Sequence, residues 1–164
     1  MKLAMAAVLV AACSFIGYCR VYALRARISA LQAFETDIAQ LGLMMEYQAL
    51  PVGELADRLR GALPAAFWQA FRAGVAQGSA REAWRQALYA EAPYGLRASD
   101  MEQLCGFGAV LGQGGRAAQK NNVDYALSNI KRLRETLQLE QAKKGGLYGT
   151  LGLLSGLAAA ILIW

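Results

Sequence analysis

The chain has 164 residues, of which 56% are hydrophobic and 18% are charged, and its net charge is +5. This length predicts one domain, and the composition is too apolar for a disordered or purely nucleic-acid-binding chain. Since the sequence contains no histidine, it excludes Ser-His-Asp and Cys-His catalytic arrangements, histidine-ligated zinc sites and histidine pH switches.

Two apolar runs without a charged residue cover residues 3–19 and 147–164. As helices they would measure about 26 and 27 Å, which is short but adequate for a bilayer core of about 30 Å. We therefore expect transmembrane helices at residues 1–19 and 147–164, with a soluble helical domain at residues 20–146. Basic residues flank both runs on the side of this domain, so the positive-inside rule predicts that the domain lies in the cytoplasm.

The first run also allows two other interpretations. It could be a cleaved signal peptide, and the residues before Cys13 resemble a lipobox, which would make Cys13 a lipidated N-terminus. The apolar residues Phe15 and Ile16 argue against this, because a polar tether usually follows a lipidated cysteine. The second run could be a buried core helix, but a helix that is apolar on all sides fits a membrane span better.

Within residues 20–146, apolar residues recur at helical spacing in the first and last stretches. The first stripe consists of Leu24, Ile28, Leu31, Phe34, Ile38, Leu41 and Met45. The second consists of Val123, Ala126, Ile130, Leu133 and Leu137. No proline interrupts either stretch, so we expect two long helices that pair as an antiparallel hairpin and continue into the two spans.

Shorter helices are predicted between these two stretches. Proline suits the first turn of a helix, and the pattern Ser-x-x-Glu is typical of a capping box. The predicted starts are Pro51, Pro64, Ser79 and Ser99. The glycine-rich segment 112–115 should end the last of these helices, and no stretch alternates with period two. The sequence thus predicts an all-α bundle of about six helices between two transmembrane helices.

Motifs for catalysis or cofactor binding are weak or absent. The glycines at positions 106, 108 and 112 are similar to a dinucleotide fingerprint, but their spacing is one residue too long and they follow no strand. We interpret them as close helix–helix contacts. No CxxC pattern occurs, so we expect no metal site and a buried Cys105. We predict no enzymatic activity and no cofactor.

Two further patterns concern binding. Gly152 and Gly156 form a GxxxG motif, which is typical of helix packing in membranes, although glycine-rich spans also contain this spacing by chance. The basic residues of the domain are scattered among acidic ones, which favours a solvated surface. An acidic protein partner is the second interpretation, and nucleic acid is less favoured because no dense basic helix occurs.

An ordered series of short patterns runs through the chain. They are Glu46-Tyr47, Leu50-Pro51, Gly78-Ser79, Ala83-Trp84, Asp100-Met101-Glu102, Leu104, Phe107-Gly108, Leu111-Gly112, Gln119, Lys143-Lys144, Tyr148, Leu151-Gly152 and Gly156-Leu157. In this order and spacing, the chain resembles the stage III sporulation protein AB family of endospore-forming bacteria over nearly its whole length. It departs from the family at Ala49-Leu50, because a threonine usually stands before the proline, and at Gln113-Gly114-Gly115, where Ser-Asp is usual.

The resemblance implies a non-enzymatic subunit of a channel complex between mother cell and forespore. Such proteins resemble the cytoplasmic domain of the type II secretion platform protein F, which is a helical bundle. The implied partners are a cytoplasmic secretion-type ATPase of the same operon, other subunits of the complex, and membrane lipid on the mother-cell side. Glu46, Tyr47 and Gln119 match the family pattern without an evident capping role, so they are the candidate partner-binding residues.

Two alternatives from other classes stay open, as does self-association. One is a membrane-anchored helical signalling domain, although the predicted topology leaves almost nothing outside the membrane to receive a cue. The other is an extracytoplasmic lipoprotein that is lipidated at Cys13.

Overall fold

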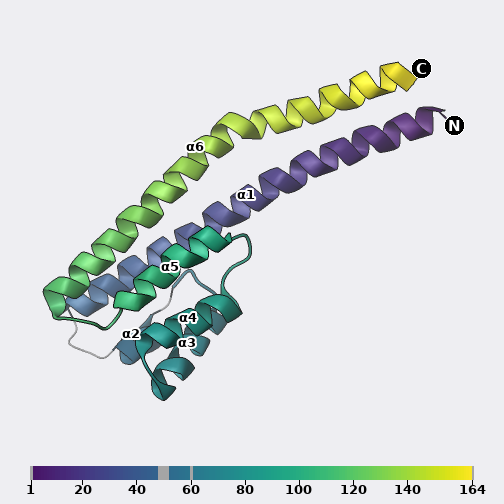
Figure 1. The fold of residues 1–164 in the computed structure, drawn as a ribbon. Helices are drawn as coiled ribbons and strands as arrows, with labels where there is room; N and C mark the ends of the chain where they lie inside the picture. The colour runs from purple at the N-terminus through teal and green to yellow at the C-terminus, as the bar shows by residue number, and fades with distance from the viewer. Residues whose placement is uncertain (1, 48–51, 60, 164) are drawn as a thin grey trace. The chain divides into compact units, whose positions relative to one another are not determined.

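The computed structural model describes the backbone of residues 2–47, 52–59 and 61–163, and every regular element in it is an α-helix (Figure 1). The helices are α1 (Lys2–Tyr47), α2 (Val52–Arg58), α3 (Ala65–Gln77), α4 (Ala80–Glu91), α5 (Ala98–Val110) and α6 (Arg116–Ile163). Side chains are described for residues 11–12, 15–47, 52–59, 61–115 and 117–143. The prediction of an all-helical chain with six helices is confirmed for this part of the chain. Pro64 directly precedes α3 as predicted, whereas Pro51 lies outside the described residues.

The chain divides into two compact units. The first unit comprises Met1–Ile28 and Glu135–Trp164, and the second comprises Ser29–Arg134. Since α1 and α6 each belong to both units, both long helices continue without a break across the boundary. The predicted continuation of the two long helices into the two apolar runs is therefore confirmed at the level of secondary structure.

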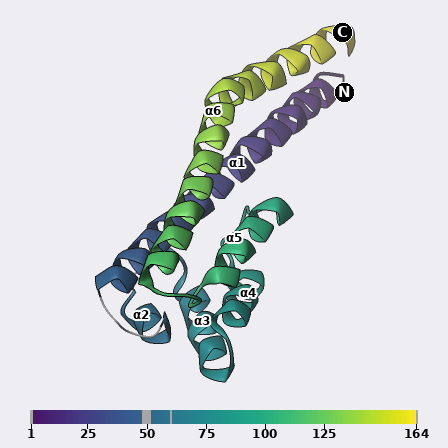
Figure 2. The same cartoon turned by 60° about the vertical axis from the view of Figure 1, so that its left-hand side comes forward.

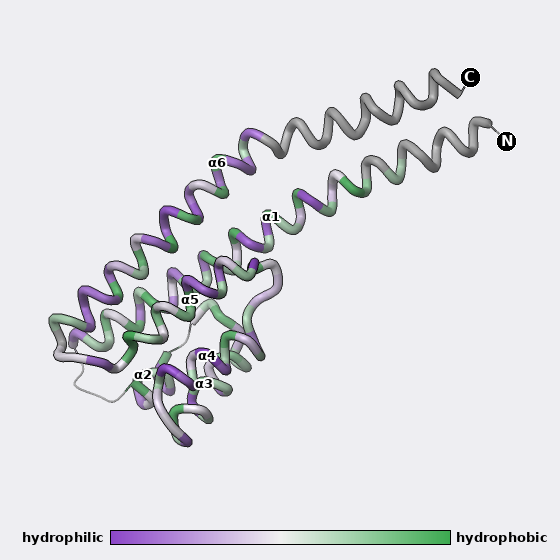
Figure 3. Tube along the Cα trace, viewed as in Figure 1, coloured by the Kyte–Doolittle hydropathy of each residue, from purple (hydrophilic) through white to green (hydrophobic). Residues whose placement is uncertain are grey.

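No helix with described side chains is long and apolar enough to cross a membrane. Most side chains of the predicted spans, 1–19 and 147–164, lie outside the described residues, and so do those of Cys13, Gly152 and Gly156. In Figure 3, the described part of α6 is largely hydrophilic with recurring hydrophobic positions.

In the second unit, α1 and α6 pair in antiparallel directions. Glu35 lies beside Arg134 and Glu46 lies beside Lys120, at N–O distances of 2.7 and 2.9 Å. Residue numbers therefore rise along α1 as they fall along α6, which confirms the predicted hairpin within this unit. The buried stripe residues of the second unit are Leu31, Phe34, Ile38, Leu41, Val123, Ala126 and Ile130. Of the other predicted stripe positions, Leu24, Met45 and Leu133 are only half-buried.

The centre of the second unit is aromatic. Successive short helices pack against one another from α2 to α5 (Figure 2), and α4 contributes the fully buried Trp84. Five rings meet Trp84 edge to face at centroid distances of 5.2–6.2 Å, namely Phe34, Phe67, Trp68, Phe71 and Phe107. Each such pair contributes about 0.5–1.5 kcal/mol beyond the burial of its area. The Trp84 indole N–H donates to the Leu104 carbonyl at 2.9 Å, so this large side chain has no unsatisfied polar atom.

A buried carboxylate joins α1 to the connection between α2 and α3. Asp37 is fully buried and accepts hydrogen bonds from the backbone N–H groups of Ala62 and Leu63 and from the indole N–H of Trp68. A Cβ atom at Gly61 would collide with this carboxylate. Only glycine therefore lets the connection approach α1 closely enough for Asp37 to receive these bonds.

Of the two predicted capping-box starts, only the N-cap at Ser79 is confirmed. The Ser79 hydroxyl accepts from the backbone N–H of Glu82 at 3.3 Å and so caps α4 as predicted. The prediction for Ser99 is wrong, because Arg97 is the N-cap of α5. The buried Asp100 carboxylate, three residues later, accepts from the backbone N–H of Arg97 at 2.9 Å. Asp100 rather than Glu102 therefore supplies the acidic partner at this helix start.

The three glycines of the apparent fingerprint have different roles. A Cβ atom at Gly108 would collide with the Trp84 ring, so the predicted close helix contact is confirmed there. At Gly106 an added Cβ would meet nothing within 4 Å, so the same prediction is wrong. Gly112 has a φ of 78° in the turn that follows α5, as expected for the glycine-rich end of this helix. Cys105 is half-buried rather than buried.

Candidate partner-binding site

Two of the three predicted partner-binding residues, Glu46 and Gln119, lie together where α1 pairs with α6 in the second unit. They line one cavity of about 210 Å³. Its other lining residues are Gly42, Met45, Ala117, Lys120 and Val123. The antiparallel hairpin thus brings together two residues that are far apart in the sequence.

An ion pair lies at this cavity. The Lys120 ammonium is 2.9 Å from the Glu46 carboxylate, and both side chains are exposed. The hydrogen bond to Glu46 raises the pKa of Lys120 above its ordinary value of 10.5. Lys120 is therefore charged at pH 7. An exposed pair of this kind contributes little to stability, so these charges are available for contacts with a partner.

The apolar walls of the cavity depend on Gly42. A Cβ atom at Gly42 would lie 2.6 Å from the Val123 side chain, so glycine allows α1 and α6 to approach closely here. Met45 lines the same cavity, and its flexible thioether side chain adapts to different shapes. An apolar cavity with a charged edge suits one apolar side chain of a partner.

Tyr47, the third predicted residue, is the last residue of α1 and is 81% exposed. Leu43 precedes it by one helical turn on the same face and is 58% exposed. The two side chains form an exposed apolar pair next in sequence to the cavity residues Gly42 and Glu46. We call the cavity together with Leu43 and Tyr47 the hairpin-end surface.

Gln119 has a local structural contact as well. Its side-chain amide donates to the Gly114 carbonyl at 3.3 Å, which joins the first turn of α6 to the glycine-rich segment. This contact caps no N–H group at the start of α6, because the Gln119 side chain donates the bond. This contact orients the residue at the edge of the cavity.

Among the described side chains, no group of three or more Cys, Asp and Glu residues is arranged to hold a metal ion. The surroundings of Gly152 and Gly156 lie outside the described residues, so the helix-packing role of these glycines stays a prediction.

A family model for stage III sporulation protein AB (spore_III_AB) matches residues 2–164. The chain belongs to this family. The resemblance drawn from the short patterns is thereby confirmed, and the stage III sporulation protein AB family gives the chain a role connected with sporulation. A comparison with curated proteins finds no match.

The fold of this stage III sporulation protein AB family member also has a solved counterpart. A structure of "Stage III sporulation protein AB (SpoIIIAB)" aligns with a TM-score of 0.59 at 20% identity. The alignment covers 72% of this chain and 98% of the other. At this identity the likeness shows a shared fold.

Lys120 and Leu43 are among the residues of the hairpin-end surface that the sequence did not indicate as partner-binding. Lys120 is one of many basic residues that are scattered through the sequence. Its pairing with Glu46 depends on the register between α1 and α6, which are far apart in the sequence. Leu43 falls outside the buried stripe, and an exposed leucine alone carries no information about binding. Its spacing of four residues from Tyr47 is the one signal that could have indicated it.

Proposed function

We propose that the protein is a non-enzymatic platform subunit that holds a secretion-type ATPase at the membrane during sporulation. The observation that carries this proposal is the direction of the hairpin in the second unit. Both long helices leave this unit at the end where Glu35 pairs with Arg134. The hairpin-end surface, with Glu46 and Lys120, lies at the other end. If the domain is attached to the membrane through the end with the Glu35–Arg134 pair, the hairpin-end surface is open to a partner.

Membrane attachment follows from the two apolar runs. Residues 1–19 and 147–164 would span the mother-cell-side membrane around the forespore and extend α1 and α6. Basic residues beside both runs, including Arg20, Lys143 and Lys144, favour a cytoplasmic position for residues 20–146. This topology offers the domain to cytoplasmic proteins.

The chemistry of the hairpin-end surface supports a protein partner. Aromatic and apolar residues that fit into pockets supply most of the binding energy in protein interfaces. Leu43 and Tyr47 are exposed anchors of this kind, and the cavity beside them accepts one from the partner. The Glu46–Lys120 pair would set the orientation of the partner by charge. The proposed partners are the ATPase of the same operon and other subunits of the channel complex.

Co-purification with that ATPase from mild detergent tests this proposal. Glu46→Lys places two like charges at the cavity, and Asp57→Lys is the matched control because Asp57 also lies in an exposed ion pair, 2.8 Å from Arg72. We expect the wild type and Asp57→Lys to retain the ATPase, and Glu46→Lys to retain roughly tenfold less. Equal retention by both variants, with unchanged melting temperatures, would contradict the proposal.

Protease accessibility tests the proposed topology. Protease added outside intact cells should leave the second unit uncut, and permeabilised cells should lose it. Digestion in intact cells would place the domain on the other side of the membrane. A mature chain that starts at a diacylated Cys13, observed by intact mass spectrometry, would support the lipoprotein alternative instead.

A further inference from the structure

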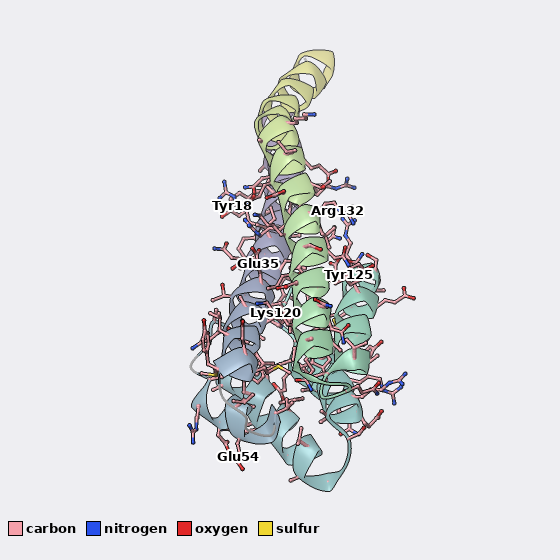
Figure 4. All side chains as sticks on the ribbon, turned by 90° about the vertical axis from the view of Figure 1, so that its left-hand side faces the viewer. Tyr18, Glu35, Glu54, Lys120, Tyr125 and Arg132 are labelled. Carbon is pink, nitrogen blue, oxygen red and sulfur yellow. The ribbon has the colours of Figure 1, made fainter. Side chains whose placement is uncertain are left out.

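A second and larger cavity lies between α5 and α6 within the second unit. Its volume is about 430 Å³, and it shares no lining residue with the cavity of the hairpin-end surface. The buried side chains of Phe107, Ala126 and Ile130 form its apolar floor. Figure 4 shows Tyr125 on the side of α6 that faces α5, where it lines this cavity. We call this cavity the α5–α6 groove.

The lining of the groove carries no charged side chain. Its lining contains none of the 17 basic and 12 acidic residues of the chain. A charged side chain buried in it would lose its hydration, and no lining residue would supply a counter-charge, which is costly. The Arg132 guanidinium, which donates to Asn129, is not part of the lining. The groove therefore complements an uncharged occupant and disfavours an acidic or basic one.

Carboxamide groups supply most of the polarity of the groove. They belong to Gln103 on α5 and to Asn122 and Asn129 on α6. Each carboxamide offers a donor and an acceptor, which is the same combination that a peptide group offers. Asn129 already accepts from Arg132 at 3.2 Å, which leaves its amide nitrogen as the donor. Peptide groups of a helix are bonded to one another, whereas those of an extended segment are free to pair with such side chains.

Gly106 keeps the groove open. An added Cβ atom there would meet nothing within 4 Å, so no packing contact requires glycine at this position. Glycine inside a helix is less favourable than alanine by roughly 0.5–1 kcal/mol. The open space at Gly106 accommodates an occupant that lies close to the α5 backbone.

We propose that the α5–α6 groove binds an extended, uncharged segment of a partner protein. The apolar side chains of this segment occupy the floor formed by Phe107, Ala126 and Ile130. Its peptide groups pair with the carboxamides of Gln103 and Asn122. This inference does not depend on the ATPase proposal, because the two surfaces have no residue in common.

Photo-crosslinking of the full chain in detergent tests the proposal. The probe is a pentapeptide of alternating photoreactive leucine and serine, acetylated at its N-terminus and amidated at its C-terminus. Crosslinks should map to residues 103–110 and 122–130. Gly106→Leu fills the groove and should abolish them, whereas Gly78→Leu should not, because an added Cβ at Gly78 also meets nothing within 4 Å. Asn122→Ala, which removes one carboxamide without filling space, should reduce them about tenfold.

Several results would overturn the proposal. These are crosslinks outside the two segments, equal crosslinking of the Gly106→Leu variant, and no crosslinking at about 1 mM peptide. Equal labelling by a peptide with glutamate in place of serine would contradict the charge argument. Crosslinks between two copies of the chain that exclude the peptide would assign the groove to self-association.

Discussion

The surroundings of Trp84 and the hairpin-end surface belong to the same unit but differ in how their side chains are held. Around Trp84, five rings pack edge to face, the indole N–H is bonded, and Gly108 lies directly against the ring. At the hairpin-end surface, a cavity of about 210 Å³ stays open and the Glu46–Lys120 pair is exposed. We therefore expect substitutions around Trp84 to lower the free energy of unfolding strongly. Substitutions of exposed side chains at the hairpin-end surface should leave the domain folded.

The largest loss of stability is expected at Asp37. Asp37→Ala leaves three donors without an acceptor, the backbone N–H groups of Ala62 and Leu63 and the indole N–H of Trp68. The donors of Leu63 and Trp68 are buried, and that of Ala62 is part-buried. An unsatisfied buried donor costs about 1–3 kcal/mol, so the two buried donors alone should lower the free energy of unfolding by roughly 2–6 kcal/mol in urea denaturation. Asp37→Asn retains one acceptor oxygen and should lose less. A loss below about 1 kcal/mol for the alanine variant would show that Asp37 does not hold this connection.

Gly108 and Gly106 form a matched pair on α5 with opposite expected effects. Gly108→Ala forces a Cβ atom against the Trp84 ring and should destabilise the protein by about 1–3 kcal/mol. Gly106→Ala meets open space and should stabilise it by about 0.5–1 kcal/mol. Thermal melts of the two variants measure the difference, and a shift of the same sign in both would refute the assignment of these two positions.

A smaller loss is expected at the start of α4. Ser79→Ala removes the acceptor for the backbone N–H of Glu82 and should cost about 1 kcal/mol. Ser128→Ala is the control, because the Ser128 hydroxyl donates to the Tyr125 carbonyl within a helix and caps no helix start. Its effect should stay within about 0.5 kcal/mol. Equal losses for both variants in urea denaturation would show that the cap is not formed in solution.

The smallest effect on stability is expected for Lys120. The pKa of Lys120 is raised in the folded protein, so its pairing with Glu46 stabilises the fold below pH 10.5. This stabilisation is lost as the pH rises through the folded-state pKa. The melting temperature of wild type should exceed that of Lys120→Met slightly at pH 7, and the difference should vanish at high pH. A difference that is constant with pH would show that the ion pair is not its cause.

The helices and the hairpin could be predicted because they depend on local patterns. The buried positions Phe34, Ile38 and Leu41 repeat at helical spacing, and this spacing alone identifies the face that is buried. Likewise, Ser79 and Glu82 lie within one turn, so their capping contact depends on no distant residue.

The contacts of Asp37 could not be predicted because they depend on a distant segment. Asp37 lies on the buried face of α1, where an acidic residue is unexpected. Its carboxylate oxygens accept from the backbone N–H groups of Ala62 and Leu63, which are 25 and 26 residues later in the sequence. The same reason applies to Glu46 and Lys120, which are 74 residues apart. At Ser99, two capping patterns overlap, and the buried position of Asp100 favours the one that starts at Arg97.

The most direct test of the platform function is the dissociation constant of the ATPase for the full chain in lipid nanodiscs. Tyr47→Ala and Tyr94→Ala form the matched pair, because these tyrosines are 81% and 78% exposed and only Tyr47 belongs to the hairpin-end surface. We predict a Kd at least about tenfold higher for Tyr47→Ala, an unchanged Kd for Tyr94→Ala, and unchanged melting temperatures for both. The same Kd for both variants and the wild type would contradict binding at this surface.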